Sequence, residues 1–268
     1  MHPIEHLRYV ARATGADPAV VAREAAAALA DMARLEPAGL VPACRRLIER
    51  HLVAGPIWWL SARILGAEDP VQAARAVMVE LADDDTDRHL AALLPDGATV
   101  MVIGWPDICG SALRSRGDAE VLVVDSGGEG APLVRRLEAA GNDATLVPDS
   151  GVGPAAAVSD LVLIEALVAG PPGVMAAPGS LAAAAVAAHS LIPVWAVTGV
   201  GRVLPLRLWE AMTTRLDQSG HEPWDRPAEM VGAELISGLI GPEGGAETEY
   251  GLAAATCPAA PELFRAAG

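Results

Sequence analysis

The chain is most constrained by its stretch from Asp160 to Pro205, where short apolar runs alternate with loops and one alanine-rich segment. The apolar run 161–166 is too short for an ordinary helix and is followed by glycine and proline, so it predicts a buried strand. Residues 181–189 are rich in alanine and predict a helix with Ser180 as its N-cap. The β-branched run 194–197 predicts a second strand.

Strand, loop, helix and strand in this order form a parallel βαβ unit, whose crossover is right-handed. Ligands of such sheets bind at the carboxyl ends of the strands. We therefore expect any site of this protein to lie around residues 165–170, 178–180 and 198–202.

The same alternation begins well before this stretch. Short apolar runs at 100–103, 121–124 and 144–147 predict three more strands, with helical segments and loops between them. Five strands that alternate with helices favour an α/β fold with a mostly parallel, doubly wound sheet. We assign this Rossmann-like domain to residues 95–240.

The ends of the chain differ from this central domain. Residues 1–94 have the periodicity and the helix starts of a helical amino-terminal domain, among them Asp17-Pro18 and Asp69-Pro70. Residues 241–268 are rich in Gly, Glu and Ala and predict a weakly ordered tail.

Two features of the helical domain invite a functional interpretation. Trp58 and Trp59 suggest an aromatic contact surface. Four aspartates at positions 83, 84, 85 and 87 precede a short helix, and we interpret them as solvated carboxylates that complement its dipole, and not as a metal site.

Bulk composition excludes several classes of function. The net charge of −15 and the lack of basic stretches beside aromatics argue against direct nucleic-acid binding. The three cysteines lie far apart without metal-ligand spacing, which favours a reducing compartment and excludes zinc. We find neither a signal-peptide pattern nor an unbroken membrane span, so we expect a cytoplasmic protein with no metal and no cofactor.

Six segments occur in an order that resembles the alpha, beta and delta subunit family of translation initiation factor 2B. These segments are VLVVDS (121–126), RRLEAAG (135–141), TLVPDSGVG (145–153), LVLIEA (161–166), GSLAAAAVAAHSLIPVWAV (179–197) and ELISGLIG (234–241). That family also holds isomerases that act on methylthioribose phosphate and ribose bisphosphate. The resemblance implies a helical amino-terminal domain, a Rossmann-like domain related to ribose-phosphate isomerases and CoA transferases, and a homodimer formed through the latter.

The chain departs from the isomerase members of that family at their functional positions. Their catalytic Asp follows the strand that matches 161–166, and the ungapped position here is Leu167, which cannot exchange a proton. Their Asn-Lys pair falls at Ala176 and Ala177. Their phosphate-holding Arg is replaced by the loop 125–130, which has no cation.

Other positions keep groups that could act. Cys109 lies close to the place of the family's catalytic Cys, and Asp107 lies nearer to it. Asp149 with Ser150 and Gly179 with Ser180 match the family's D-S and G-S pairs. From the residues themselves, Glu165 ends a predicted strand, and Arg202 is one of few cations near the predicted strand ends.

The candidate catalytic residues are Asp107, Cys109, Asp149 and Glu165, and the candidate ligand contacts are Ser150, Gly179, Ser180 and Arg202. We interpret Cys109 as a buried, inert thiol, because no activating His or Lys follows nearby.

Three hypotheses follow. The first is a non-catalytic binding or regulatory dimer whose pocket takes a small phosphorylated metabolite, either a sugar phosphate or a nucleotide. The second is an active aldose-ketose sugar-phosphate isomerase. The third is a purely structural interaction subunit. Loss of the family's Asp, Asn, Lys and Arg together argues against the second.

Overall fold

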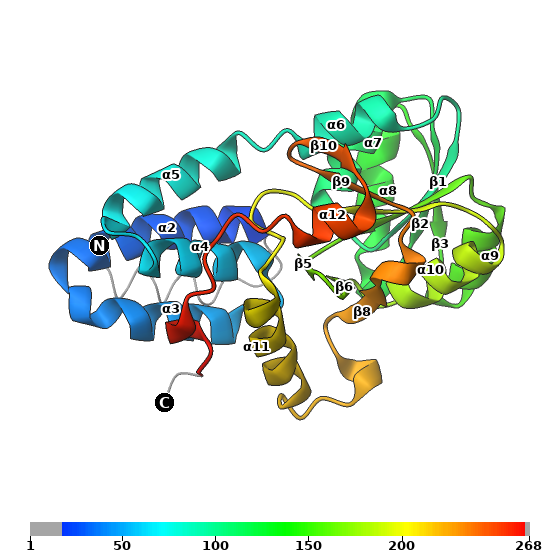
Figure 1. The fold of residues 1–268 in the computed structure, drawn as a ribbon. Coiled ribbons are helices and arrows are strands. Elements are labelled where there is room, and N and C mark those ends of the chain that lie inside the picture. The colour runs from blue at the N-terminus through cyan, green and yellow to red at the C-terminus, as the bar shows by residue number, and fades with distance from the viewer. Residues whose placement is uncertain (1–17, 266–268) are drawn as a thin grey trace.

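The computed structural model describes residues 18–265, in which a group of helices lies beside a sheet flanked by helices (Figure 1). The predicted helical features of residues 3–17 lie outside the described residues. None of the helices in the described part of the chain is long and apolar enough to cross a membrane. The described residues contain no group of three or more His, Cys, Asp or Glu side chains arranged to hold a metal ion.

The helical part has the elements that the sequence predicts. They are α2 (Pro18–Leu35), α3 (Leu40–Arg50), α4 (Gly55–Leu65), α5 (Pro70–Ala82) and α6 (Thr86–Leu93). Pro70 stands at the first position of α5, and the Asp69 carboxylate accepts hydrogen bonds from two amides of the first turn. Proline and an acidic cap at these positions satisfy amides that would otherwise lack a partner, which is why the helix begins there.

The expectation of an aromatic contact surface at Trp58 and Trp59 is wrong, because both side chains are fully buried. Their indole nitrogens donate to the carbonyl oxygen of Leu52 and to Thr256 Oγ1, so even their polar edges are used inside the molecule. In a chain with so few aromatics, the large rings fill the core where the helices meet.

The main sheet has seven strands in the order β10-β9-β7-β4-β1-β2-β3. Six of them run parallel, and β10 alone pairs antiparallel. Their bounds are β1 (Thr99–Ile103), β2 (Glu120–Val124), β3 (Asp143–Val147), β4 (Leu161–Glu165), β7 (Val194–Val197), β9 (Gly238–Gly241) and β10 (Gly244–Ala246). The five predicted strands and the mostly parallel α/β fold are confirmed.

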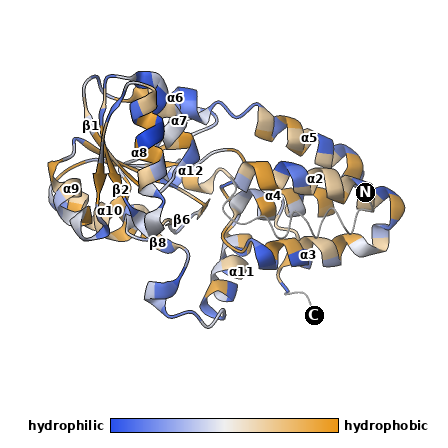
Figure 2. Cartoon of the chain, turned by 180° about the vertical axis from the view of Figure 1, so that it is seen from behind, coloured by the Kyte–Doolittle hydropathy of each residue, from blue (hydrophilic) through white to orange (hydrophobic). Residues whose placement is uncertain are grey.

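Alternate residues of each central strand face opposite layers of helices. Met101 and Ile103 pack toward α9 (Val152–Val158) and α10 (Ser180–His189). Val100 and Val102 pack toward α6, α7 (Asp107–Arg116) and α8 (Gly130–Ala139). Figure 2 shows β1 and β2 coloured as hydrophobic, between the helices of the α/β part. Because both faces are covered, the strands are apolar throughout and show no polar alternation.

A second, small sheet was not predicted. It consists of β5 (Val168–Gly170), β6 (Gly173–Ala176) and β8 (Glu229–Gly232), all paired antiparallel in the order β5-β6-β8. Strands of three or four residues around a Gly-Pro-Pro turn give too short a signal to be told from a loop. This sheet lies between the helical part and the main sheet (Figure 1).

The segment from residue 241, which we expected to be a weakly ordered tail, contains regular structure up to Leu263. Its elements are β10, α12 (Thr248–Ala253) and a short 3-10 helix (Pro261–Leu263). Leu252 and Leu263 are fully buried, so two apolar side chains anchor a segment whose small, polar composition is otherwise typical of a loop.

The hydrophobic clusters cross the domain boundary that we expected at residue 94. Leu90 of α6 belongs to the cluster on one face of the main sheet. Conversely α11 (Leu206–Asp217), which follows the last predicted strand, places Leu208, Trp209 and Met212 in the cluster of the helical part. The two parts of the molecule therefore share elements of the chain.

The segment 199–204 joins the two parts. Val200 N donates to Asp84 Oδ2 at 2.8 Å, which gives one of the four aspartates a structural role. The carbonyl oxygen of Arg202 accepts from Ala169 N at 2.7 Å. Gly201 has φ +74°, and a Cβ built there would lie 2.8 Å from the Trp59 ring. Only glycine fits both this backbone conformation and this close approach.

We predict that Gly201→Ala destabilises the protein more than Gly220→Ala. Both glycines have positive φ, but no atom lies within 4 Å of the position of a Cβ at Gly220. The control should therefore cost about 1 to 2 kcal/mol of unfolding free energy from backbone strain alone. Gly201→Ala should add about 1 to 3 kcal/mol from overpacking against Trp59. Urea denaturation measures both, and equal losses would contradict the tight junction.

Candidate functional site

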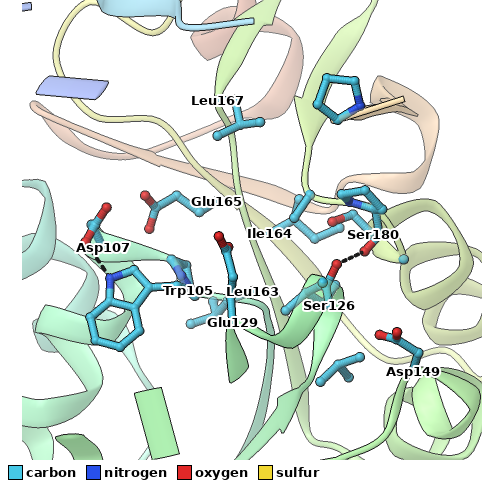
Figure 3. Close-up of a pocket in the computed structure, with 18 of the residues that line it drawn as sticks. Trp105, Asp107, Ser126, Glu129, Asp149, Leu163, Ile164, Glu165, Leu167 and Ser180 are labelled. Carbon is cyan, nitrogen blue, oxygen red and sulfur yellow. Dashed lines mark hydrogen bonds between the residues drawn. The ribbon is translucent and has the colours of Figure 1, made fainter. Parts of the chain in front are cut away.

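An open cleft of about 880 Å³ lies at the carboxyl ends of β1, β2 and β4 and at the amino end of α10. This is the place where a doubly wound sheet binds its ligands. Its described lining combines backbone of the loops after the strands with acidic, hydroxyl and aromatic side chains (Figure 3). Its volume is within the range of clefts that bind small molecules.

The fold brings six of the eight candidate residues to this cleft. They are Asp107, Asp149, Glu165, Gly179, Ser180 and Arg202. Cys109 and Ser150 are not among the described lining residues: Cys109 is buried in α7, and Ser150 is exposed beside the cleft. The roles that we assigned to these residues stay predictions, and the geometry below shows what each of them contacts.

Glu165 ends β4 and is bound on both sides of its carboxylate. Oε2 accepts hydrogen bonds from Ile108 N at 2.8 Å and from Cys109 N at 2.9 Å, in the first turn of α7. Oε1 pairs with Arg202 Nη1 at 2.9 Å. A carboxylate at the amino end of a helix is stabilised both by these bonds and by the helix dipole.

Arg202 is buried together with its partner. The exposed fraction of the Arg202 side chain is 3%, that of Glu165 is 8%, and Arg202 Nη1 also donates to the carbonyl oxygen of Ala166 at 2.6 Å. Burying two charges costs several kcal/mol per ion, and close pairing with additional hydrogen bonds offsets that cost. The guanidinium that we expected to contact an anion is thus held inside the protein by Glu165, an arrangement that does not favour that role.

Cys109 provides no thiolate at neutral pH. Burial, followed by the nearby negative charge of Glu165, raises the pKa of its thiol well above the ordinary value. Burial also raises the pKa of Cys44 to about 12. A thiol in such surroundings is neither a good nucleophile nor a ready proton donor. The three cysteines are free, and the interpretation of Cys109 as a buried thiol agrees with this geometry.

Asp107 and Trp105 form one wall of the cleft (Figure 3). Trp105 Nε1 donates to Asp107 Oδ1 at 2.8 Å, which orients both side chains. The guanidinium of Arg136 lies 5.5 Å from the centre of the Trp105 ring. Trp105 was not among the residues predicted from the sequence. Its position in the loop after β1, at the edge of the sheet where ligands bind, could have indicated it.

Ser126 and Glu129 form another part of the lining, in the loop after β2. Ser126 Oγ donates to the carbonyl oxygen of Pro178 at 2.8 Å, next to the start of α10. Glu129 is exposed, and its carboxylate points into the cleft in Figure 3. Sequence reasoning noted that this loop lacks a cation, but it did not identify either side chain as part of the site.

Carboxylates of the protein bind the amino ends of three helices near this edge of the sheet. Glu165 binds α7, as described above. Asp125 Oδ1 accepts from Gly130 N at 2.9 Å at the start of α8. Glu229 Oε1 accepts from Leu181 N at 2.6 Å in the first turn of α10. Helix amino ends are ready-made anion sites, and here the protein's own side chains occupy them.

Comparison with known proteins gives matches at the level of structure. No family model and no curated protein sequence matches the chain. The translation initiation factor eIF-2B structure from Pyrococcus horikoshii OT3 superposes with a TM-score of 0.76 at 15% identity, covering 93% of this chain and 98% of that chain. The chain has the fold of an initiation factor 2B subunit.

Two other initiation factor 2B structures agree. The eIF2B beta structure from Chaetomium thermophilum gives a TM-score of 0.70 at 14% identity, covering 96% of this chain and 92% of that chain. A tetrameric eIF2B-beta2-delta2 complex from C. thermophilum contains a chain with a TM-score of 0.69 at 14% identity, covering 94% of this chain and 92% of that chain. These matches confirm the fold that the sequence resemblance implied.

We predict that Glu165→Leu lowers the unfolding free energy by about 3 to 5 kcal/mol, because it leaves the buried Arg202 charge without its carboxylate. The double variant Glu165→Leu with Arg202→Met should recover part of this loss, since no buried charge remains. Glu80→Leu is the matched control: it breaks the Arg63 to Glu80 pair, in which the Glu80 side chain is 42% exposed, and should cost less than about 1 kcal/mol. Urea denaturation measures all three. Equal losses for Glu165→Leu and Glu80→Leu would contradict the role of the buried pair.

Proposed function

We propose that this protein is a divergent, non-catalytic member of the initiation factor 2B alpha, beta and delta family that binds a small molecule in the cleft and acts as a regulatory dimer. One observation carries the proposal. The ionisable group at the end of β4, Glu165, is held by Arg202 and two α7 amides, while the cleft beside it stays open. A retained cleft supports binding, and both oxygens of this carboxylate are already engaged within the protein.

The isomerase alternative lacks the residues that the resemblance assigns to this chemistry. Aldose-ketose isomerisation needs an acid and a base on either side of two sugar carbons. Leu167, at the position that the resemblance gives to the catalytic Asp, lines the cleft with an apolar side chain. Ala177, at one position of the Asn-Lys pair, lines it as well. Cys109 is buried, so of the candidate catalytic residues only Asp107 and Asp149 reach the cleft outside the buried ion pair.

We predict binding without turnover. A thermal-shift screen of the full chain against neutral sugars, amino sugars, pentose phosphates and nucleotides should find a stabilising ligand, since a ligand at 100 times its Kd adds about 2.7 kcal/mol of stability. The same protein should not convert methylthioribose phosphate or ribose bisphosphate. Turnover that Asp107→Asn abolishes would overturn the proposal in favour of the isomerase. Silence across the whole screen would favour a purely structural subunit.

Two observations support the proposed dimer: the similarity to initiation factor 2B structures and the exposed apolar side chains of the α/β part. The C. thermophilum protein forms a tetrameric complex of beta and delta subunits. In this chain Leu146 on the edge strand β3, Val158 and Leu191 are exposed by 43%, 70% and 92%. Large apolar side chains in the α/β part are suited to bury surface against a second copy.

We predict a mass in solution of twice the 27.5 kDa of one chain. Light scattering coupled to size exclusion, run over a hundredfold range of concentration, measures it. A single-chain mass throughout that range would contradict the dimer and leave the binding proposal in place.

A further inference from the structure

Ser180 is a largely buried residue that lines the cleft, and its hydroxyl has no hydrogen-bond partner among residues 18–265. Ser180 is the first residue of α10, its exposed fraction is 2%, and it lines the cleft. Within residues 18–265 its Oγ makes no hydrogen bond. Ser180 Oγ is not one of the fully enclosed unpaired polar atoms of the described residues, so it is accessible from the cleft and can donate or accept a hydrogen bond there. A ligand in the cleft could supply this bond.

The charges around the cleft determine what kind of ligand fits. The described lining contains four carboxylates and one basic side chain. The carboxylates are Asp107, Glu129, Asp149 and Glu165, and the basic side chain is Arg202, which is buried against Glu165. Asp107 and Glu165 have partners within the protein, so a phosphate in this cleft would face the carboxylates of Glu129 and Asp149, whereas an ammonium group would be attracted by them.

The amino end of α10 does not reverse this preference. A helix amino end beside an open cleft is ordinarily a phosphate site. Here Glu229 Oε1 accepts from Leu181 N at 2.6 Å, so a carboxylate already holds an amide that would otherwise face an anion. Ser180 can still bond a neutral hydroxyl, because its Oγ both donates and accepts.

Ser180, Ser126 and Glu129 lie along one side of the cleft. Ser126 Oγ donates to the carbonyl oxygen of Pro178, two residues before Ser180. A Cβ built on Gly104 would lie 3.8 Å from Ser126 Cβ and 3.9 Å from Glu129 Oε2, so both side chains approach the same point at the end of β1. In the described part of the chain the Glu129 carboxylate has no ion pair. The hydroxyls of Ser180 and Ser126 and the carboxylate of Glu129 therefore lie on the same side of the cleft.

We propose that the cleft binds a small hydroxylated amine, such as an amino sugar, with its ammonium group at Glu129 and its hydroxyls at Ser126 and Ser180. This inference rests on the proposed function and names the ligand class of the same cleft. The sequence resemblance suggested a phosphorylated metabolite, which carries negative charge. The ligand proposed here carries positive charge instead.

Three probes with the same ring test the charge preference. Calorimetric titration of the full chain at pH 6.5 uses glucosamine, glucose and glucose 6-phosphate, which differ in charge. Glucosamine should bind at least about tenfold more tightly than glucose, since a hydrogen bond assisted by charge is worth about that factor. Glucose 6-phosphate should bind more weakly than glucose.

Variants test the residues. Glu129→Gln should remove the preference for glucosamine over glucose, whereas Ser180→Ala should weaken both sugars. Glu138→Gln, an exposed change later in the helix that follows Glu129, is the matched control and should change neither. If Ser180→Ala fails to fold, Glu129→Gln carries the test, because Glu129 is exposed.

The outcomes separate this inference from the proposed function. Tightest binding of glucose 6-phosphate, or equal binding of glucosamine and glucose, overturns the charge preference and leaves a binding protein. No binding of the three sugars together with a hit in the wider thermal-shift screen overturns only the ligand class. Silence in both experiments overturns the ligand class and the proposed function together.

Discussion

The buried ion pair between Glu165 and Arg202 connects the parts of this structure that surround the cleft. One carboxylate at the end of β4 binds the first turn of α7 and the guanidinium of the segment that follows β7. That segment in turn contacts the helical part through Gly201 and Trp59. Two charges can stay in such a place only when both are paired and hydrogen-bonded. The pair therefore fixes the wall of the cleft while removing its own charges from chemistry.

The same arrangement shows how a fold shared with initiation factor 2B subunits can keep an open cleft while the protein's own carboxylates bind the helix amino ends around it. Strand ends and helix amino ends, where such folds bind anions, are occupied here by Glu165, Asp125 and Glu229. Each carboxylate satisfies backbone amides of its helix, which stabilises the scaffold. The proposed cationic, hydroxylated ligand follows from the carboxylate of Glu129 and the hydroxyls of Ser126 and Ser180 that line the cleft.

Elements with strong local signals were predictable. The βαβ unit from Asp160 to Pro205 and the helix start at Asp69-Pro70 were found because β-branched runs, alanine and capping residues act over a few neighbouring positions. The small sheet of β5, β6 and β8 was missed because its strands are short and pair across distant parts of the chain. Order after residue 241 was missed because it depends on where Leu252 and Leu263 are buried, which composition does not reveal.

By itself the sequence determined the class of fold, the edge of the sheet where a site must lie, and six candidate residues that do meet there. Tertiary structure alone decided which of these groups are engaged. Arg202 was expected to face a ligand and instead pairs with Glu165, 37 positions away in the chain. The sequence left open whether Trp58 and Trp59 face a core, a dimer interface or solvent, and the structure places them in the core. Secondary structure follows from local interactions, whereas burial and charge pairing join residues far apart in the sequence, and these contacts are defined only once the chain has packed.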